Sequence, residues 1–142
     1  MSEKSNVRIL VVDDEKVFLE EVEEMLAWGG DDVEVASDYA STLEKVRTFK
    51  PEIIFLDLKM TPKSGFQIAD ELINTLGMKD IRIIAMTGFF TAKEHDLFVR
   101  MCGVKKCLIK PVHPLDFISN IEFLTEKKKH GAGTKVPPAN DV

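Results

Sequence analysis

The sequence is poor in cysteine and contains no long hydrophobic run. Its two cysteines, Cys102 and Cys107, are too few for the disulfide framework of a small secreted domain, and they fit a reducing cytoplasm. No stretch approaches the roughly 18–20 apolar residues that a membrane-spanning helix needs. The first six residues are polar and lack the apolar region of a secretory signal. We therefore expect a cytoplasmic protein that has no membrane partner.

Positive charge is also scarce. The chain has 24 acidic residues against 19 basic ones, which gives a net charge of −5 and argues against a nucleic-acid partner. Its 142 residues, 44% of them hydrophobic, suit one domain with a sizeable core. Because the sequence from Gly131 onward has no periodicity, we expect a domain over residues 1–129 and a flexible tail over 130–142.

Short apolar runs alternate with longer amphipathic stretches along the chain. The apolar runs predict five strands, at residues 7–12, 33–37, 53–56, 81–86 and 105–109. Helical periodicity and capping residues predict five helices, at 16–28, 39–48, 64–76, 91–102 and 114–129. In the last helix, the spacing of Leu115, Ile118, Ile121 and Leu124 predicts that these four face inward.

The alternation predicts a doubly wound α/β fold of the form (βα)5. Strands that are apolar throughout indicate a parallel sheet with helices on both faces, a three-layer sandwich. The flavodoxin-like strand order 2-1-3-4-5 is the common solution for five such strands. In that order, a ligand site lies beyond the carboxyl ends of the strands, near the switch between strands 1 and 3.

Polar residues follow the carboxyl ends of four predicted strands: Asp13, Asp14, Asp57, Thr87 and Lys110. Clustered carboxylates repel one another unless a cation lies between them. An all-oxygen ligand set favours Mg²⁺, for which Mn²⁺ can substitute. An Asp-Asp pair at a strand end is by itself more often a turn or a helix cap. The third carboxylate at the neighbouring strand end makes the metal site the better interpretation.

The charges in this cluster also favour a phosphoryl site. Three carboxylates, one Mg²⁺ and Lys110 sum to zero. Conversion of Asp57 to an acyl phosphate would add roughly one more negative charge, which the metal and the lysine could stabilise. The hydroxyl of Thr87 offers a further donor. Taken singly, Thr87 and Lys110 would be routine residues for a strand end and a surface.

Five motifs now make a resemblance visible: VVDDE at 11–15, FLDLKM at 55–60, SG at 64–65, MTG at 86–88 and KP at 110–111. Together they resemble a response-regulator receiver domain of two-component signalling, similar to the stand-alone chemotaxis regulators, over about residues 6–126. The resemblance implies that Asp57 is the phosphoacceptor. It also implies that Asp14 and Asp57 bind Mg²⁺ directly, with Asp13 binding through water, and that the Lys59 backbone carbonyl is another ligand. Thr87 and Lys110 would contact the phosphoryl group, and the Lys110–Pro111 bond would be cis.

The implied activity is signalling. Such a protein takes phosphate from a sensor histidine kinase or a histidine phosphotransfer protein, and it then switches partner binding. It is not an enzyme beyond self-phosphorylation from small donors and autodephosphorylation. Because no output domain follows, we expect the signal to pass to a downstream protein or through a homodimer. A shuttle in a phosphorelay is the alternative.

The sequence departs from the family pattern at three places. Thr61 separates Met60 from Pro62, where proline usually follows the methionine directly. Cys107 stands where a Tyr or Phe usually changes rotamer with the strand-4 threonine. Phe89 and Phe90 are unusually apolar, and they either pack on the next helix or cover the site. Because Cys107 is small, we expect signal to leave through residues 88–90 and the helix at 91–102.

Other function classes fit less well. An aspartyl-phosphate hydrolase of the haloacid-dehalogenase type needs a second Asp two residues after the nucleophile, where this chain has Lys59. A flavin carrier needs a phosphate-cradling loop after strand 1, where Asp13, Asp14 and Glu15 would repel phosphate. A receiver-like scaffold that is not phosphorylated stays open because of Cys107.

Overall fold

The structure is a computed structural model that describes residues 7–78, 80–88 and 104–130. Five parallel strands form one sheet: β1 (Arg8–Val12), β2 (Asp32–Ala36), β3 (Ile53–Asp57), β4 (Arg82–Thr87) and β5 (Val104–Ile109). The strand order is β2-β1-β3-β4-β5, so the predicted order is confirmed. The predicted helix at 91–102, together with Phe89 and Phe90, lies outside the described residues, and so do residues 131–142.

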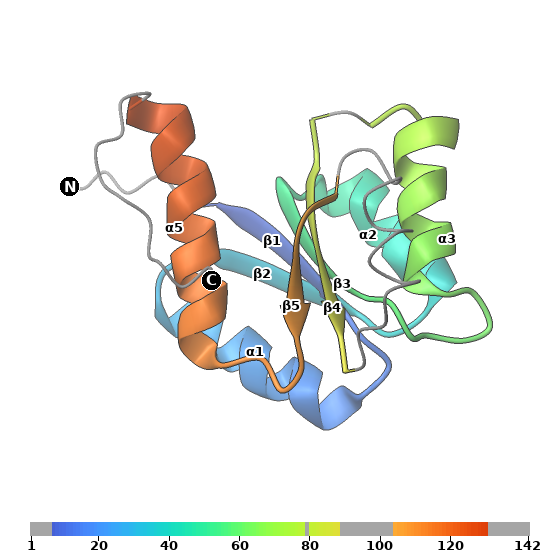
Figure 1. Ribbon diagram of the computed structural model, residues 1–142, viewed down its shortest axis with the longest axis horizontal. Coiled ribbons are helices and arrows are strands. Elements are labelled where there is room, and N and C mark those ends of the chain that lie inside the picture. Colours follow the sequence, from blue (N-terminus) through green and yellow to red (C-terminus); the bar gives the residue numbers. More distant parts are fainter. Residues whose placement is uncertain (1–6, 79, 89–103, 131–142) are drawn as a thin grey trace.

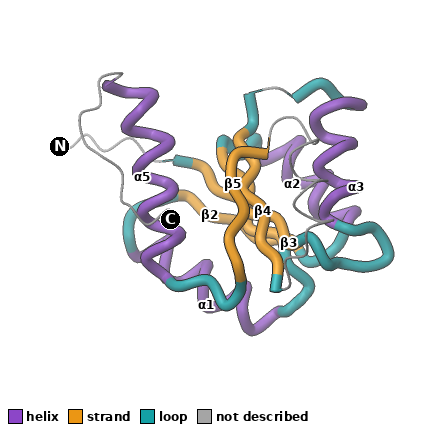
Figure 2. The backbone as a smooth tube through the Cα atoms, in the orientation of Figure 1, coloured by secondary structure: helices purple, strands orange, loops and turns teal. Residues whose placement is uncertain are grey.

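Helices cover both faces of this sheet, as Figures 1 and 2 show. The described helices are α1 (Lys16–Trp28), α2 (Tyr39–Phe49), α3 (Gly65–Asp70), the π-helical turn η1 (Glu71–Thr75) and α5 (Pro114–His130). One hydrophobic cluster joins α1 and α5 to the sheet, and a second joins α2, α3 and η1 to its other face. The three-layer α/β fold predicted from the sequence is therefore confirmed.

Local sequence signals explain where these helices begin. The carboxylate of Asp38 accepts a hydrogen bond from the Ser41 N–H at 2.8 Å and caps α2. Ser64 and Gln67 form the predicted reciprocal capping box at the start of α3. The predicted helix at 64–76 is present, but its second half is π-helical, with the Leu76 N–H bonded to the Glu71 carbonyl at 2.8 Å.

The predicted inward face of α5 is partly wrong. Ile121 is buried and Leu124 packs against the core, but Leu115 is 64% exposed and Ile118 is 38% exposed. Phe117 takes the inward position instead, with its ring centroid 4.7 Å from that of Phe55. The predicted face and the observed one share Ile121 and Leu124. The sheet receives the face that buries the large aromatic ring, because that ring removes the most apolar surface from water.

Candidate functional site

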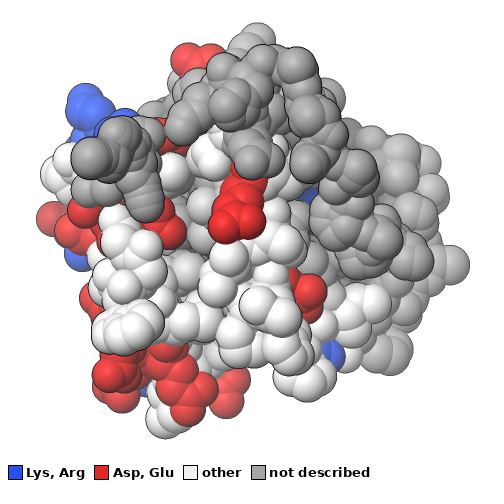
Figure 3. Space-filling model, turned by 90° about the vertical axis from the view of Figure 1, so that its left-hand side faces the viewer, with Lys and Arg blue, Asp and Glu red and all other residues white. Residues whose placement is uncertain are grey.

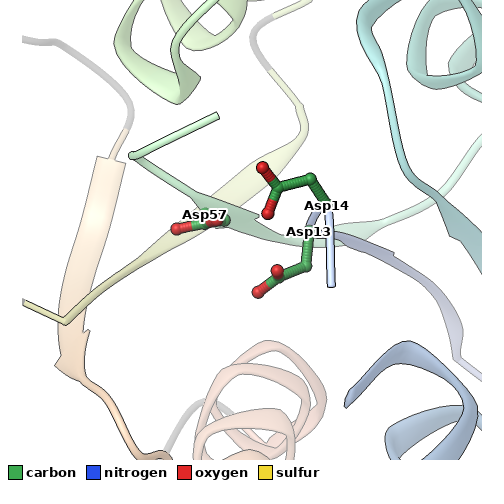
Figure 4. A group of neighbouring side chains, drawn as sticks. All are labelled: Asp13, Asp14 and Asp57. Carbon is green, nitrogen blue, oxygen red and sulfur yellow. The ribbon is translucent and has the colours of Figure 1, made fainter. Parts of the chain in front are cut away.

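The three predicted acidic residues meet at the carboxyl end of the sheet (Figure 4). Asp13 and Asp14 directly follow β1, and Asp57 is the last residue of β3. Because β1 and β3 are neighbours in the sheet, their ends lie side by side, and one carboxylate oxygen of each residue lies within 4.8 Å of the other two. An all-oxygen set of this kind fits a hard divalent cation such as Mg²⁺.

Asp13 is fully buried and bonded on both carboxylate oxygens. Oδ1 accepts a hydrogen bond from the Glu15 N–H at 3.0 Å, and Oδ2 accepts one from the Lys110 ammonium at 2.6 Å. These contacts give the buried charge a partner and restrict its orientation. Asp14, in contrast, is exposed. The two neighbouring carboxylates therefore differ in their surroundings, one buried and hydrogen-bonded and the other open to solvent.

Asp57 is only 3% exposed. Its Oδ1 accepts a hydrogen bond from the Lys59 N–H at 3.2 Å and lies 3.7 Å from the Lys110 ammonium. Burial and the charge of Asp13 raise the pKa of Asp57, although the Lys59 N–H and the Lys110 charge act against this increase. The site thus holds a buried carboxylate whose negative charge is only partly balanced, which is an environment that favours cation binding.

Lys110 connects the acidic residues across the sheet. It follows β5, and its backbone N–H donates to the Thr87 carbonyl at 2.7 Å, which ties the ends of β4 and β5 together. Burial acts to lower the pKa of Lys110, but the hydrogen bond to Asp13 and the charge of Asp57 outweigh it and raise that pKa. The side chain is therefore a firmly protonated donor at the centre of the site.

Thr87 is the last residue of β4 and is fully buried, one strand away from Asp57. Thus Thr87 and Lys110 lie at adjacent strand ends, as the sequence predicted. Cys107 is half-buried on β5, where it packs with Leu58 and Ala85. Phe89 and Phe90, which the sequence analysis placed near the site, lie outside the described residues.

The loop between β3 and α3 approaches the backbone of Asp57 very closely. The Gly65 N–H donates to the Leu58 carbonyl at 3.2 Å, and the Leu58 N–H donates to the Met86 carbonyl at 2.9 Å. A Cβ atom at Gly65 would lie 2.2 Å from the Asp57 carbonyl oxygen, so only glycine fits there. The Ser-Gly motif is visible in the sequence, but the spacing of residues along the chain does not show that Gly65 lies against the backbone of Asp57.

Two X-Pro bonds beside the site are cis. The Lys110–Pro111 bond is cis, which confirms the expectation drawn from the family resemblance. The Thr61–Pro62 bond is also cis, at the place where the sequence departs from the usual methionine-proline order. The loop in which Thr61 separates Met60 from Pro62 thus contains a second cis proline.

A groove runs from Lys110 along α1 and α5. It has a volume of about 740 Å³, and its apolar lining includes Phe18, Val22, Met25 and Phe117. The Lys110 ammonium lies 5.2 Å from the centroid of the Phe18 ring, within reach of a cation–π interaction. Figure 3 looks onto the α5 side of the molecule and shows acidic side chains scattered over this face. No helix in the described ranges is long and apolar enough to cross a membrane.

Comparisons with known proteins agree with this geometry. The model of the family described as "Response regulator receiver domain" matches residues 9–122. The response regulator MprA of Mycobacterium ulcerans is 33% identical over 124 residues, which cover 87% of this chain and 52% of MprA. The chain spans about half the length of this relative.

Solved structures show the same similarity. A CheY-like receiver domain protein from Methanospirillum hungatei superposes with a TM-score of 0.78 at 26% identity, covering 89% of this chain and all of that one. The receiver domain of a DNA-binding response regulator from Colwellia psychrerythraea gives a TM-score of 0.77 at 27% identity, covering 85% of this chain and 99% of its own.

Proposed function

The chain belongs to the response regulator receiver domain family of two-component signalling, and from this premise we propose that Asp57 accepts a phosphoryl group in an Mg²⁺-dependent reaction. The observation that carries the proposal is the position of Asp57. This buried carboxylate lies within 4.8 Å of two further carboxylates and 3.7 Å from the Lys110 ammonium. Among the described residues, this is the one group of three acidic, histidine or cysteine side chains whose ligand atoms lie close enough together to hold a metal ion.

The carboxylate of Asp57 is the nucleophile. Both described contacts of that carboxylate, from the Lys59 N–H and the Lys110 ammonium, go to Oδ1, which favours Oδ2 as the attacking atom. A new O–P bond forms while the bond from phosphorus to the donor breaks. The donor is a phosphohistidine or a small acyl phosphate, and its electron pair leaves with the histidine nitrogen or the acyl oxygen.

Asp13, Asp14, Asp57 and the Lys59 backbone carbonyl would hold Mg²⁺. The ion would supply positive charge that offsets repulsion between the acidic residues and the phosphoryl oxygens. In the product, the Lys110 ammonium moves from Asp13 toward a phosphoryl oxygen, since the acyl phosphate carries the larger negative charge. The Thr87 hydroxyl donates to the same group. These changes of contact couple the phosphoryl group to β4 and β5.

The partners follow from the family. The phosphodonor is a sensor histidine kinase or a histidine phosphotransfer protein in the cytoplasm. The output passes to a downstream protein or to a second copy of the chain, and the alternative output is onward transfer in a phosphorelay. Turnover beyond self-phosphorylation from small donors and autodephosphorylation is not expected, because the phosphoryl group ends on the protein itself.

Intact-mass measurement tests this proposal. Incubation with acetyl phosphate and Mg²⁺ should add about 80 Da, the mass of one phosphoryl group. EDTA should prevent the adduct, and Asp57→Asn should abolish it. Asp32→Asn, which changes an exposed carboxylate at the start of β2, serves as the matched control and should be labelled like the wild type. An undiminished adduct in Asp57→Asn would refute the assignment. No adduct in the wild type would favour a scaffold that is not phosphorylated.

A further inference from the structure

Three side chains meet beside the loop that follows Asp57. Tyr39 is the first residue of α2, Lys63 lies in the loop, and Glu71 lies where α3 passes into η1. The Tyr39 hydroxyl is 2.7 Å from both carboxylate oxygens of Glu71. The Lys63 ammonium lies 3.6 Å from Glu71 Oε1 and 4.2 Å from the centroid of the Tyr39 ring. This group, which we call the Tyr39 cluster, joins the loop to two helical elements.

The loop at residues 58–64 is held at both of its ends by described residues. Leu58 and Met60 are buried and anchor its first half, and Ser64 caps α3 at its end. Thr61 and Pro62, between those anchors, are exposed. Lys63 follows these two residues, and its side chain joins the exposed half of the loop to Tyr39 and Glu71.

The chemistry of the Tyr39 cluster suits a persistent attachment. The Tyr39 ring packs against the hydrophobic cluster that contains Met60, the buried residue of the loop's first half. The hydrogen bond to Glu71 raises the pKa of Tyr39, and its hydroxyl therefore stays a donor. A hydrogen bond to a carboxylate is stronger than one between neutral groups, and the Lys63 charge adds to it.

We propose that Tyr39, Lys63 and Glu71 are positioning residues for the phosphoryl-accepting site. By fastening the loop, they hold the backbone of Lys59, whose N–H donates to Asp57 and whose carbonyl is the expected metal ligand. None of the three contacts the reacting atoms. The inference rests on the proposed function, because it concerns how precisely the same site is assembled. Residues that support a ligand in this way commonly influence metal affinity although they bind no metal themselves.

The test measures Mg²⁺ affinity rather than phosphorylation. Tyr39→Phe keeps the ring but loses the hydroxyl, and Glu71→Gln keeps an acceptor but loses the charge. Lys63→Met removes the ammonium and leaves the Tyr39–Glu71 bond in place. Each variant should bind Mg²⁺ about three- to tenfold more weakly in calorimetric titration, which is less than the loss seen when a direct supporting partner of a ligand is removed. Amide exchange at residues 58–64 should become faster in all three.

Glu34→Gln is the matched control. It breaks the ion pair between Lys45 of α2 and Glu34 of β2, a partly exposed pair that does not touch the loop. The control should lose a comparable amount of thermal stability while Mg²⁺ affinity and exchange at 58–64 stay at wild-type values. A purely structural role for the Tyr39 cluster would instead lower the melting temperature and leave Mg²⁺ affinity unchanged.

The outcomes separate this inference from the proposed function. If the wild type binds Mg²⁺ but the three variants bind it equally well, the inference is refuted and the proposed function stands. The inference is likewise refuted if Glu34→Gln weakens Mg²⁺ binding as much as the three variants of the Tyr39 cluster do. If the wild type itself binds no Mg²⁺, the proposed function fails first. Should Tyr39→Phe fail to fold in circular dichroism, the result for Lys63→Met, which changes a partly exposed side chain, decides the question.

Discussion

Replacement of Asp57 with asparagine is expected to stabilise the protein when no metal is present. Asp57 carries a buried charge next to Asp13 and Asp14, and asparagine keeps nearly the same shape without that charge. Its side-chain oxygen can still accept the hydrogen bond from the Lys59 N–H. The substitution therefore removes carboxylate repulsion while it preserves the packing around the end of β3.

The distances set the size of the effect. At 4.8 Å, the upper limit of the separations in this group, and an effective dielectric constant of 20, each repulsion acting on Asp57 amounts to about 3.5 kcal/mol. The attraction of Lys110 at 3.7 Å offsets about 4.5 kcal/mol of the two repulsions together. Because Asp14 is exposed and its charge is screened by solvent, we expect a net gain of about 1–2 kcal/mol in the unfolding free energy. For a domain of this size, that gain raises the melting temperature by about 3–8 °C.

Urea and thermal unfolding in EDTA at low salt would measure this gain. The pKa of Asp57 is raised from 3.8 in the folded state, chiefly by burial and by the charge of Asp13. The stability that this raised pKa contributes is therefore fully present below pH 3.8. It is lost as the pH rises through the folded-state pKa of Asp57. The advantage of Asp57→Asn should be largest at neutral pH and should shrink on acidification.

Asp32→Asn removes an exposed carboxylate at the other end of the sheet and should change stability by less than about 0.5 kcal/mol. If Asp57→Asn were no more stable than the wild type in EDTA at pH 7, carboxylate repulsion at Asp57 would not be the destabilising force proposed. A difference that did not narrow as the pH fell would contradict this explanation as well.

Three further substitutions test separate contacts of the site. Asp14→Ala should remove most of the Mg²⁺-dependent rise in melting temperature, and a persistent rise would show that Asp14 is not a principal ligand. Lys110→Met leaves the buried Asp13 carboxylate without its ammonium partner, so urea unfolding in EDTA at pH 7 should show a loss of about 2–3 kcal/mol. The same variant should bind Mg²⁺ more tightly than the wild type, and unchanged stability and affinity would contradict the assigned ion pair. Gly65→Ala should cost about 2 kcal/mol or more, because its Cβ would overlap a backbone oxygen, whereas Gly29→Ala, with no contact below 3.5 Å, should cost much less.

Local sequence patterns were enough to predict the fold class and the convergence of three acidic residues. Apolar runs rich in β-branched residues specify buried strands, and capping residues such as Asp38 and Ser64 specify where helices begin. In a parallel sheet, all carboxyl ends lie at one edge, so Asp13, Asp14 and Asp57 had to converge once the strand order was known. These inferences need only local pattern and topology, both of which are written along the chain.

Which of several compatible side-chain contacts form depends on how the helices and strands pack. Periodicity predicted that Leu115 and Ile118 of α5 face inward, but the packing of Phe117 on Phe55 turns an overlapping face of the helix toward the sheet. The Lys110–Asp13 ion pair joins residues 97 positions apart, and no local pattern specifies which carboxylate the ammonium selects. The Tyr39 cluster likewise draws on three separate elements. Side-chain partners of this kind depend on directions and distances that exist only after the helices and strands have packed together.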